Sequence, residues 1–231
     1  PVLGARGGAG ASVLAVAVGQ AVLAAGGLAL LVDCDPLGGG LDLTLGAERQ
    51  EGLRWPTLQL TGGRVPVAAL RSALPGRTGG RGGLTVLSCG RSGPDPEPGA
   101  VVAVVDSGTR AGGTVVCDLP RRLTPAACAA LDRADLAVLV VPADVKACMA
   151  AKPLVDQAEA RGVRLRAVIR GPAPGGLTAS QVVDAVGVPL LTAMRSEPRL
   201  ATTLDEGRFP SRARGPLARA AREVLAALHA R

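Results

Sequence analysis

Aromatic residues are almost absent from this 231-residue chain, which has one tryptophan, one phenylalanine and no tyrosine. It therefore lacks the stacking platforms with which many proteins bind single-stranded nucleic acid. No apolar run reaches the roughly 18 uncharged residues of a membrane-spanning helix, and no signal peptide is visible. Hydrophobic residues still make up 48% of the chain, which excludes a disordered protein and predicts a core of alanine, valine and leucine.

Lysine is also scarce, because Lys146 and Lys152 are the only two. Arginine therefore carries almost all of the basic charge behind the formal net charge of +7. Such an arginine bias, with abundant alanine, glycine and proline, is typical of a GC-rich genome, and codon drift explains it more simply than a selected nucleic-acid surface does. Attraction to DNA or to anionic lipid stays open on charge alone.

The five cysteines are an odd number with no close pairing in the sequence. This spacing indicates neither a disulfide framework nor a zinc site. We interpret most of them as small buried residues of a cytoplasmic protein. The chain opens at Pro1 directly on an apolar segment, and we expect that a further segment precedes it in the whole protein.

Apolar segments alternate with helical patterns along the whole chain, as in an α/β domain with a parallel sheet covered on both faces. We expect one domain over residues 1–231: a three-layer sandwich with a mostly parallel, doubly wound sheet of about seven strands. The expected strands are Val2–Ala5, Leu28–Asp33, Leu84–Leu87, Thr114–Asp118, Leu136–Val141, Arg164–Ile169 and Pro189–Ala193. The expected helices are Ser12–Ala25, Pro66–Leu74, Ala100–Arg110, Thr124–Arg133, Val145–Arg161, Thr178–Val186 and Pro216–Ala230, and the glycine-rich segment 76–83 is expected to be a loop.

A glycine-rich segment follows the first expected strand and has the form of a phosphate-binding loop. Glycines allow backbone amides to turn toward a phosphate, and the start of the next helix adds partial positive charge. Such loops normally end in lysine followed by serine or threonine, but here Ala11 stands in the lysine position. The candidate nucleotide-binding residues of the loop are Arg6, Gly7, Gly8, Ala9, Gly10, Ala11 and Ser12.

Three aspartates follow strands that are expected to end at the same edge of the sheet. Asp33 and Asp35 follow the second expected strand, and Asp118 ends the strand Thr114–Asp118. A single aspartate in such a place is commonly only a turn former. Three of them beside a phosphate-binding loop instead suit Mg²⁺, which prefers oxygen ligands and retains several waters. We therefore predict Ser12, Asp33 and Asp118 as metal-site residues and Asp35 as the group that orients a water.

These motifs resemble the deviant P-loop ATPases of the MinD/ParA class, and the resemblance runs almost end to end. The loop, the Asp33-x-Asp35 pair, Gly40-Leu41-Asp42-Leu43 and Asp118 match family motifs in order. The closest resemblance is to the actinobacterial CpaE-like subgroup with septum site-determining proteins, whose members carry an N-terminal receiver-like domain. It rests on the loop, Gly52-Leu53-Arg54-Trp55-Pro56, segment 116–124 and Arg170-Gly171-Pro172.

The resemblance implies ATP or ADP with Mg²⁺, a homodimer, and partners in cell division or pilus assembly. It implies a regulator that positions septum-site or Flp/Tad pilus machinery, recruited from the cytoplasm to membrane, pole or septum. It places Arg6 at a residue that reaches a partner's nucleotide, and it places Arg170 and Pro198 beside the base. Arg170 replaces an asparagine there, which affects base selection.

Replacement of the loop lysine by Ala11 affects the expected chemistry most, because removing one such cation can cost about 10²- to 10³-fold in rate. We therefore expect weak or absent hydrolysis. Two alternatives stay open: a dimerising adaptor that works without nucleotide, and a DNA-binding partition-type protein. The last expected helix carries Arg219 and Arg222, and Arg212 and Arg214 lie just before it. This helix either binds membrane through a basic amphipathic face or packs on the sheet.

Overall fold

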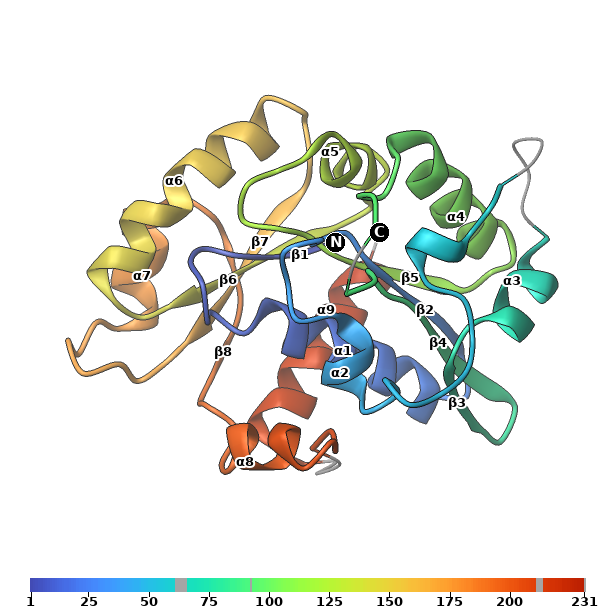
Figure 1. Ribbon diagram of the computed structural model, residues 1–231. Helices are drawn as coiled ribbons and strands as arrows, with labels where there is room; N and C mark the ends of the chain where they lie inside the picture. Colours follow the sequence, from blue (N-terminus) through green and yellow to red (C-terminus); the bar gives the residue numbers. More distant parts are fainter. Residues whose placement is uncertain (61–65, 92, 211–213, 231) are drawn as a thin grey trace.

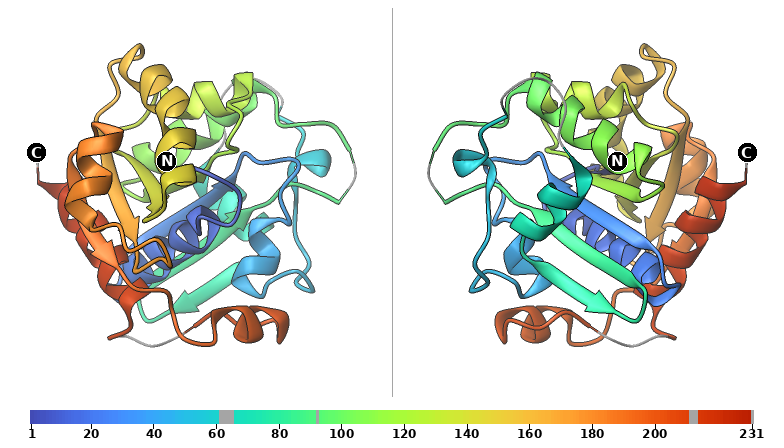
Figure 2. Two further views of the ribbon diagram at one scale, coloured as in Figure 1. Left: turned by 90° about the vertical axis from the view of Figure 1, so that its left-hand side faces the viewer. Right: turned by 90° about the vertical axis from the view of Figure 1, so that its right-hand side faces the viewer.

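The computed structural model describes residues 1–60, 66–91, 93–210 and 214–230. Across these residues, eight strands form one sheet between two layers of helices (Figures 1 and 2). The strands are β1 (Val2–Gly4), β2 (Leu28–Asp33), β3 (Gly76–Gly79), β4 (Gly82–Leu87), β5 (Thr114–Asp118), β6 (Ala137–Pro142), β7 (Leu165–Arg170) and β8 (Leu190–Met194). The helices are α1 (Ala11–Ala24), α2 (Leu41–Leu45), α3 (Val67–Ala73), α4 (Pro98–Arg110), α5 (Pro125–Leu131), α6 (Val145–Glu159), α7 (Ala179–Val186), α8 (Leu200–Asp205) and α9 (Pro216–His229), with a 3₁₀ turn η1 (Trp55–Thr57).

The sheet has the order β3-β4-β2-β5-β1-β6-β7-β8, and all neighbouring strands are parallel except β3 and β4. The expected three-layer α/β architecture is therefore confirmed. The interpretation of segment 76–83 as a loop was wrong, because Gly76–Gly79 forms an edge strand that pairs antiparallel with β4. Its glycines hide the alternating pattern by which a strand is normally found.

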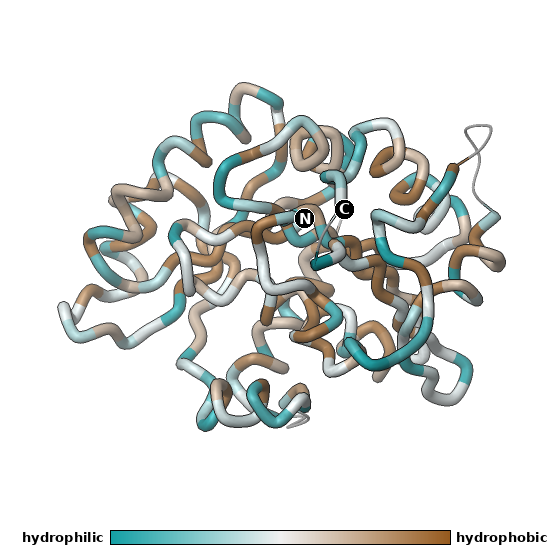
Figure 3. Tube along the Cα trace, in the orientation of Figure 1, coloured by the Kyte–Doolittle hydropathy of each residue, from teal (hydrophilic) through white to brown (hydrophobic). Residues whose placement is uncertain are grey.

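Two hydrophobic cores lie on the two faces of the sheet, and the tube in Figure 3 shows hydrophobic segments concentrated along the central strands. Alternate residues of one strand point to opposite faces. Leu30 and Val32 of β2 therefore belong to the core that α3, α4, α5, α6 and α7 cover, while Leu31 belongs to the core that α1, α2 and α9 cover. This arrangement places the carboxyl ends of β1, β2, β5, β6 and β7 at one edge of the molecule.

Polar side chains define where three of the helices begin. Thr124 accepts a hydrogen bond from the amide of Ala127, Thr178 forms a capping box with Gln181, and Asp144 accepts from the amide of Ala147 at 2.8 Å. These contacts satisfy amides that the first turn of a helix leaves without partners. Both threonines open helices that the sequence predicts to begin at these residues. Asp144 matters further because it lies just beyond the end of β6.

The last helix packs against the body of the protein. Leu217, Ala221, Val224 and Leu225 of α9 are buried in the core that α1 and β8 share. This confirms the packed alternative for the apolar face of α9, and Arg212 lies outside the described residues. Among the described residues, no helix has the length and apolar character needed to cross a membrane.

Gly46, which follows α2, gives a test of how tightly the chain is packed at this end. Its φ is +73°, and an added methyl group would overlap the carbonyl oxygen of Gly207. We expect Gly46→Ala to lower the free energy of unfolding by about 2–3 kcal/mol, measured by chemical denaturation. Gly39→Ala is the matched control, because nothing lies within 4 Å of the position of its added carbon. Equal losses in the two variants would contradict this account.

Candidate functional site

The glycine-rich loop joins the end of β1 to the start of α1 in the middle of the sheet. Gly8 and Gly10 have φ values of +71° and +101°, and nothing lies within 4 Å of the Cβ positions of Gly7 and Gly8. The loop is therefore open on this side. Helix α1 starts at Ala11 and has no side-chain cap. Open backbone at an uncapped helix start is a suitable place for an oxyanion.

Asp118 ends β5 next to the start of α1. Its carboxyl is buried and forms a hydrogen bond with the side chain of Ser12. Burial raises the pKa of Asp118 to about 8; the Ser12 hydrogen bond opposes this, and the charges of Asp33 and Asp35 add to it. The structure therefore brings together three sequence-predicted aspartates and the first helical turn. Exchange of a proton for a cation at Asp118 would relieve the cost of burying a charge.

Asp33 is the most extensively hydrogen-bonded carboxylate of the group. Its two oxygens accept hydrogen bonds from the backbone amides of Asp35, Leu41 and Cys89 and from the hydroxyl of Ser88, at 3.0–3.2 Å. Burial raises the pKa of Asp33, and these four hydrogen bonds oppose that rise. Because its oxygens are already engaged, Asp33 fixes the shape of the segment that carries Asp35.

Asp35 and Trp55 are the other two residues that matter at the end of β2. Asp35 is half-buried and accepts a hydrogen bond from the amide of Leu37 at 3.2 Å. The buried Trp55 donates from Nε1 to the carbonyl oxygen of Asp33 at 2.7 Å. Trp55 therefore anchors the end of β2. The half-buried position leaves Asp35 accessible to a water.

In the described part of the chain, no group of three or more histidine, cysteine, aspartate or glutamate side chains is arranged to hold a metal ion. The donors near the loop are the Ser12 hydroxyl and the Asp118 carboxyl. This small set fits Mg²⁺, which usually takes one or two protein oxygens and completes its shell with waters and substrate phosphates. Asp33 as a direct ligand stays a prediction, since its oxygens already accept four hydrogen bonds.

Arg6 and Asp144 form an ion pair beside the loop. Nη2 of Arg6 lies 2.8 Å and Nε 3.3 Å from the same carboxylate oxygen of Asp144, the residue that caps α6. The hydrogen bond from Arg6 lowers the pKa of Asp144, and the amide of Ala147 lowers it further. The sequence singled out Arg6 but gave no sign of this partner, which is 138 positions away.

The two residues predicted near the base lie in different places. Arg170 ends β7, and its Nη1 is 3.4 Å from where a Cβ on Gly10 would be, so its side chain reaches the loop. Pro198 is exposed and lines a pocket with Arg77, Thr203 and Phe209. Its role at a base stays a prediction.

Asp42 is a buried carboxylate that we did not assign to the site from the sequence. It is linked to Asp33 through a shared serine, Ser88. Asp42 accepts hydrogen bonds from Arg54 at 2.9 Å, from Arg91 at 3.2 Å and from Ser88 at 3.1 Å. Burial raises its pKa, but the two arginines outweigh burial and the net shift is downward. The shared Ser88 joins Asp42 to Asp33. The only sequence signal was the position of Asp42 within a family-like motif.

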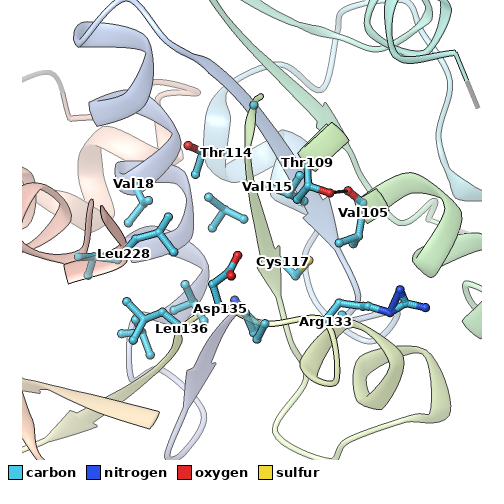
Figure 4. A pocket seen from close by; sticks show the side chains of 18 of the residues that line it. Val18, Val105, Thr109, Thr114, Val115, Cys117, Arg133, Asp135, Leu136 and Leu228 are labelled. Carbon is cyan, nitrogen blue, oxygen red and sulfur yellow. Dashed lines mark hydrogen bonds between the residues drawn. The ribbon is translucent and has the colours of Figure 1, made fainter. Parts of the chain in front are cut away.

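A separate cavity of about 390 Å³ lies near the amino ends of the strands, away from the loop (Figure 4). Pro1, Thr114 and Leu136 line it, and each lies at or just before the start of β1, β5 or β6. Ligands of doubly wound sheets bind beyond the carboxyl ends of the strands. The glycine loop therefore remains the candidate site.

No family model matches the chain. It is 53% identical over 227 residues to two Mycobacterium tuberculosis proteins, "Uncharacterized protein Rv3660c" (strain H37Rv) and "Uncharacterized protein MT3760" (strain CDC 1551). The match covers 98% of this chain, which spans 63% of the length of those relatives.

Solved structures share the whole fold at low identity. A ParA family ATPase from Chlorobium tepidum superposes with a TM-score of 0.81 and 15% identity, covering 99% of this chain and 96% of that one. MinD from Aquifex aeolicus gives 0.73 and 19%, covering 99% and 97%. MinD from Pyrococcus horikoshii, solved with Mg-ADP, gives 0.71 and 17%, covering 99% and 95%. The chain therefore has the fold of the ParA and MinD ATPases.

Proposed function

We propose that this chain binds an adenine nucleotide with Mg²⁺ at the loop of residues 4–12 and acts as a ParA/MinD-like spatial regulator. The observation that carries the proposal is an open glycine loop faced by Asp33, Asp35 and Asp118 at the ends of adjacent strands. The loop can hold a phosphate group, and carboxylates beside the loop suit the metal ion that accompanies the phosphate.

Each residue has a defined role in this proposal. The loop amides and Arg6 contact phosphate, Ser12 and Asp118 hold Mg²⁺, and Asp33 keeps the metal side of the site in shape. Asp35 orients a water, and Pro198 lies on the base side. Bound Mg²⁺ would neutralise charge on the phosphates. Because Ala11 replaces the usual lysine, hydrolysis is weak or absent.

The cellular role that we propose is the placement of septum-site or Flp/Tad pilus machinery by a homodimer, as in the CpaE-like and septum site-determining proteins. Fold similarity to MinD, including a MinC:MinD complex from Aquifex aeolicus with a TM-score of 0.75 and 19% identity, supports a division role. Recruitment from the cytoplasm to membrane, pole or septum, and a receiver-like domain before this segment, belong to the same proposal.

Calorimetric titration with ATP and ADP tests the nucleotide site directly. We expect Mg-dependent binding by the wild-type chain and at least tenfold weaker Mg-dependent binding by Ser12→Ala, because the variant removes a hydroxyl ligand of the metal. Ser180→Ala, an exposed serine at the start of α7, is the matched control and should bind like the wild type.

The same titration separates the proposal from its main alternative. Absence of heat and of any thermal shift at millimolar nucleotide would overturn the nucleotide-dependent function. A dimer that forms without nucleotide and is unchanged in Asp35→Ala would instead support the adaptor. Light scattering with and without ATP measures this difference.

A further inference from the structure

The loop lacks the usual lysine, and the charge of the one arginine that the loop itself carries, Arg6, is already balanced by a carboxylate. Ala11 occupies the position at which phosphate-binding loops carry a lysine that reaches the outer phosphates. Arg6 is held by Asp144 through two contacts with one carboxylate oxygen. A bound polyphosphate would therefore need a positive charge from another part of the fold.

Arg170 brings such a charge to the loop from β7. Its Nη1 lies 3.4 Å from the Cβ position of Gly10, the residue directly before Ala11. In the residues that the structure describes, Arg170 forms no ion pair within 4 Å, although Arg6 does. Its guanidinium is thus directed at the defective position of the loop and has no carboxylate of its own.

The local charge balance points the same way. Arg6 and Arg170 both interact electrostatically with Asp144, so two guanidinium groups share one carboxylate. Burial lowers the pKa of Arg170, and the charge of Arg6 lowers it further. A half-buried cation next to a second cation is costly unless an anion compensates it. An oxyanion at the loop would compensate it directly.

We propose that Arg170 replaces the missing loop lysine and binds the phosphate groups of the nucleotide. This inference rests on the proposed nucleotide-binding function and assigns to Arg170 a role at phosphate rather than at the base. A guanidinium offers paired donors to phosphate oxygens, which lets it act from a neighbouring strand where a lysine would act from the loop.

The experiment is calorimetric titration of ATP and of inorganic tripolyphosphate into four proteins: the wild type, Arg170→Ala, Arg166→Ala and the double variant Arg170→Ala/Ala11→Lys. Arg166 is the matched control, because it lies on the same strand and, four residues earlier, on the same face, at the end away from the loop. Thermal melts of each protein establish that it is folded. If Arg170→Ala does not fold, Arg170→Gln takes its place.

We expect Arg170→Ala to bind both ligands about 10- to 100-fold more weakly, since it loses charge-assisted hydrogen bonds to phosphate. Arg166→Ala should bind like the wild type, and the added lysine of the double variant should restore most of the affinity. Two results would overturn the inference and leave the proposed function intact. In the first, the wild type binds and Arg170→Ala binds as tightly. In the second, Arg170→Ala and Arg166→Ala are weakened equally. The same holds if tripolyphosphate affinity is unchanged and only the preference for ATP over GTP moves, because Arg170 would then contact the base. Failure of the wild type to bind either ligand would overturn both proposals.

Discussion

Asp33→Ala is expected to lower the free energy of unfolding by about 4 kcal/mol or more. The substitution removes both oxygens that accept from the buried amides of Leu41 and Cys89, from the part-buried amide of Asp35 and from the hydroxyl of Ser88. Each buried donor left without a partner costs about 1–3 kcal/mol. The donors belong to three different segments, so the end of β2, the start of α2 and the end of β4 lose their common anchor. Urea denaturation followed by circular dichroism measures the loss.

Asp35→Ala is the control for this prediction, because it removes a carboxylate from the same segment, only two positions after Asp33. Asp35 is half-buried and accepts one hydrogen bond, from Leu37. We expect a change of less than about 1 kcal/mol. If the two variants are equally stable, the carboxylate of Asp33 is not the anchor that we describe.

The stability of the metal-free protein is expected to fall by a few kcal/mol between about pH 4 and about pH 8. The folded protein holds a proton on Asp118 up to its pKa of about 8, whereas the unfolded chain releases it near the ordinary value of 3.8. The folded state therefore binds more protons in this range. Its extra stability is fully present below pH 3.8 and is lost as the pH rises through about 8. Denaturation in EDTA at a series of pH values measures the slope.

Asp118→Asn separates this residue from every other titrating group. The amide resembles the protonated carboxyl in shape and cannot ionise, so the pH slope of the variant should be shallower than that of the wild type. Mg²⁺ with nucleotide should protect the wild type most at high pH, where no proton competes for Asp118. Parallel slopes in the two proteins would show that Asp118 ionises normally.

The fold could be predicted from the sequence because the buried parallel strands are continuous apolar runs between helical patterns. All seven expected strands are present with small shifts of their ends. The short helices α2 and α8 were not expected, since five or six residues carry too little periodicity. Strand β3 was missed because its glycines carry no side-chain pattern and because its partner β4, not its own sequence, stabilises it.

The site could be predicted only in part. Local motifs gave the loop, Ser12 and the three aspartates, because a strand end fixes each of them on one edge of the sheet. The contacts of Arg6 with Asp144 and of Arg170 with the loop depend on how β6 and β7 stand beside β1. No spacing in the sequence encodes such contacts between distant segments. The position of Arg170 at the end of β7 does not by itself show that its side chain reaches the loop. The direction of the side chain, which the sequence does not reveal, brings its guanidinium there.

The contact between Trp55 and the end of β2 makes the intrinsic tryptophan fluorescence sensitive to the conformation of the Asp35 segment. Trp55 is the only tryptophan, there is no tyrosine to contribute background emission, and its indole donates to the residue that holds the Asp35 segment in place. Rearrangement of that segment would alter the polarity around the indole. Intrinsic fluorescence at a single wavelength therefore follows this corner of the molecule in real time, in the unlabelled wild-type chain.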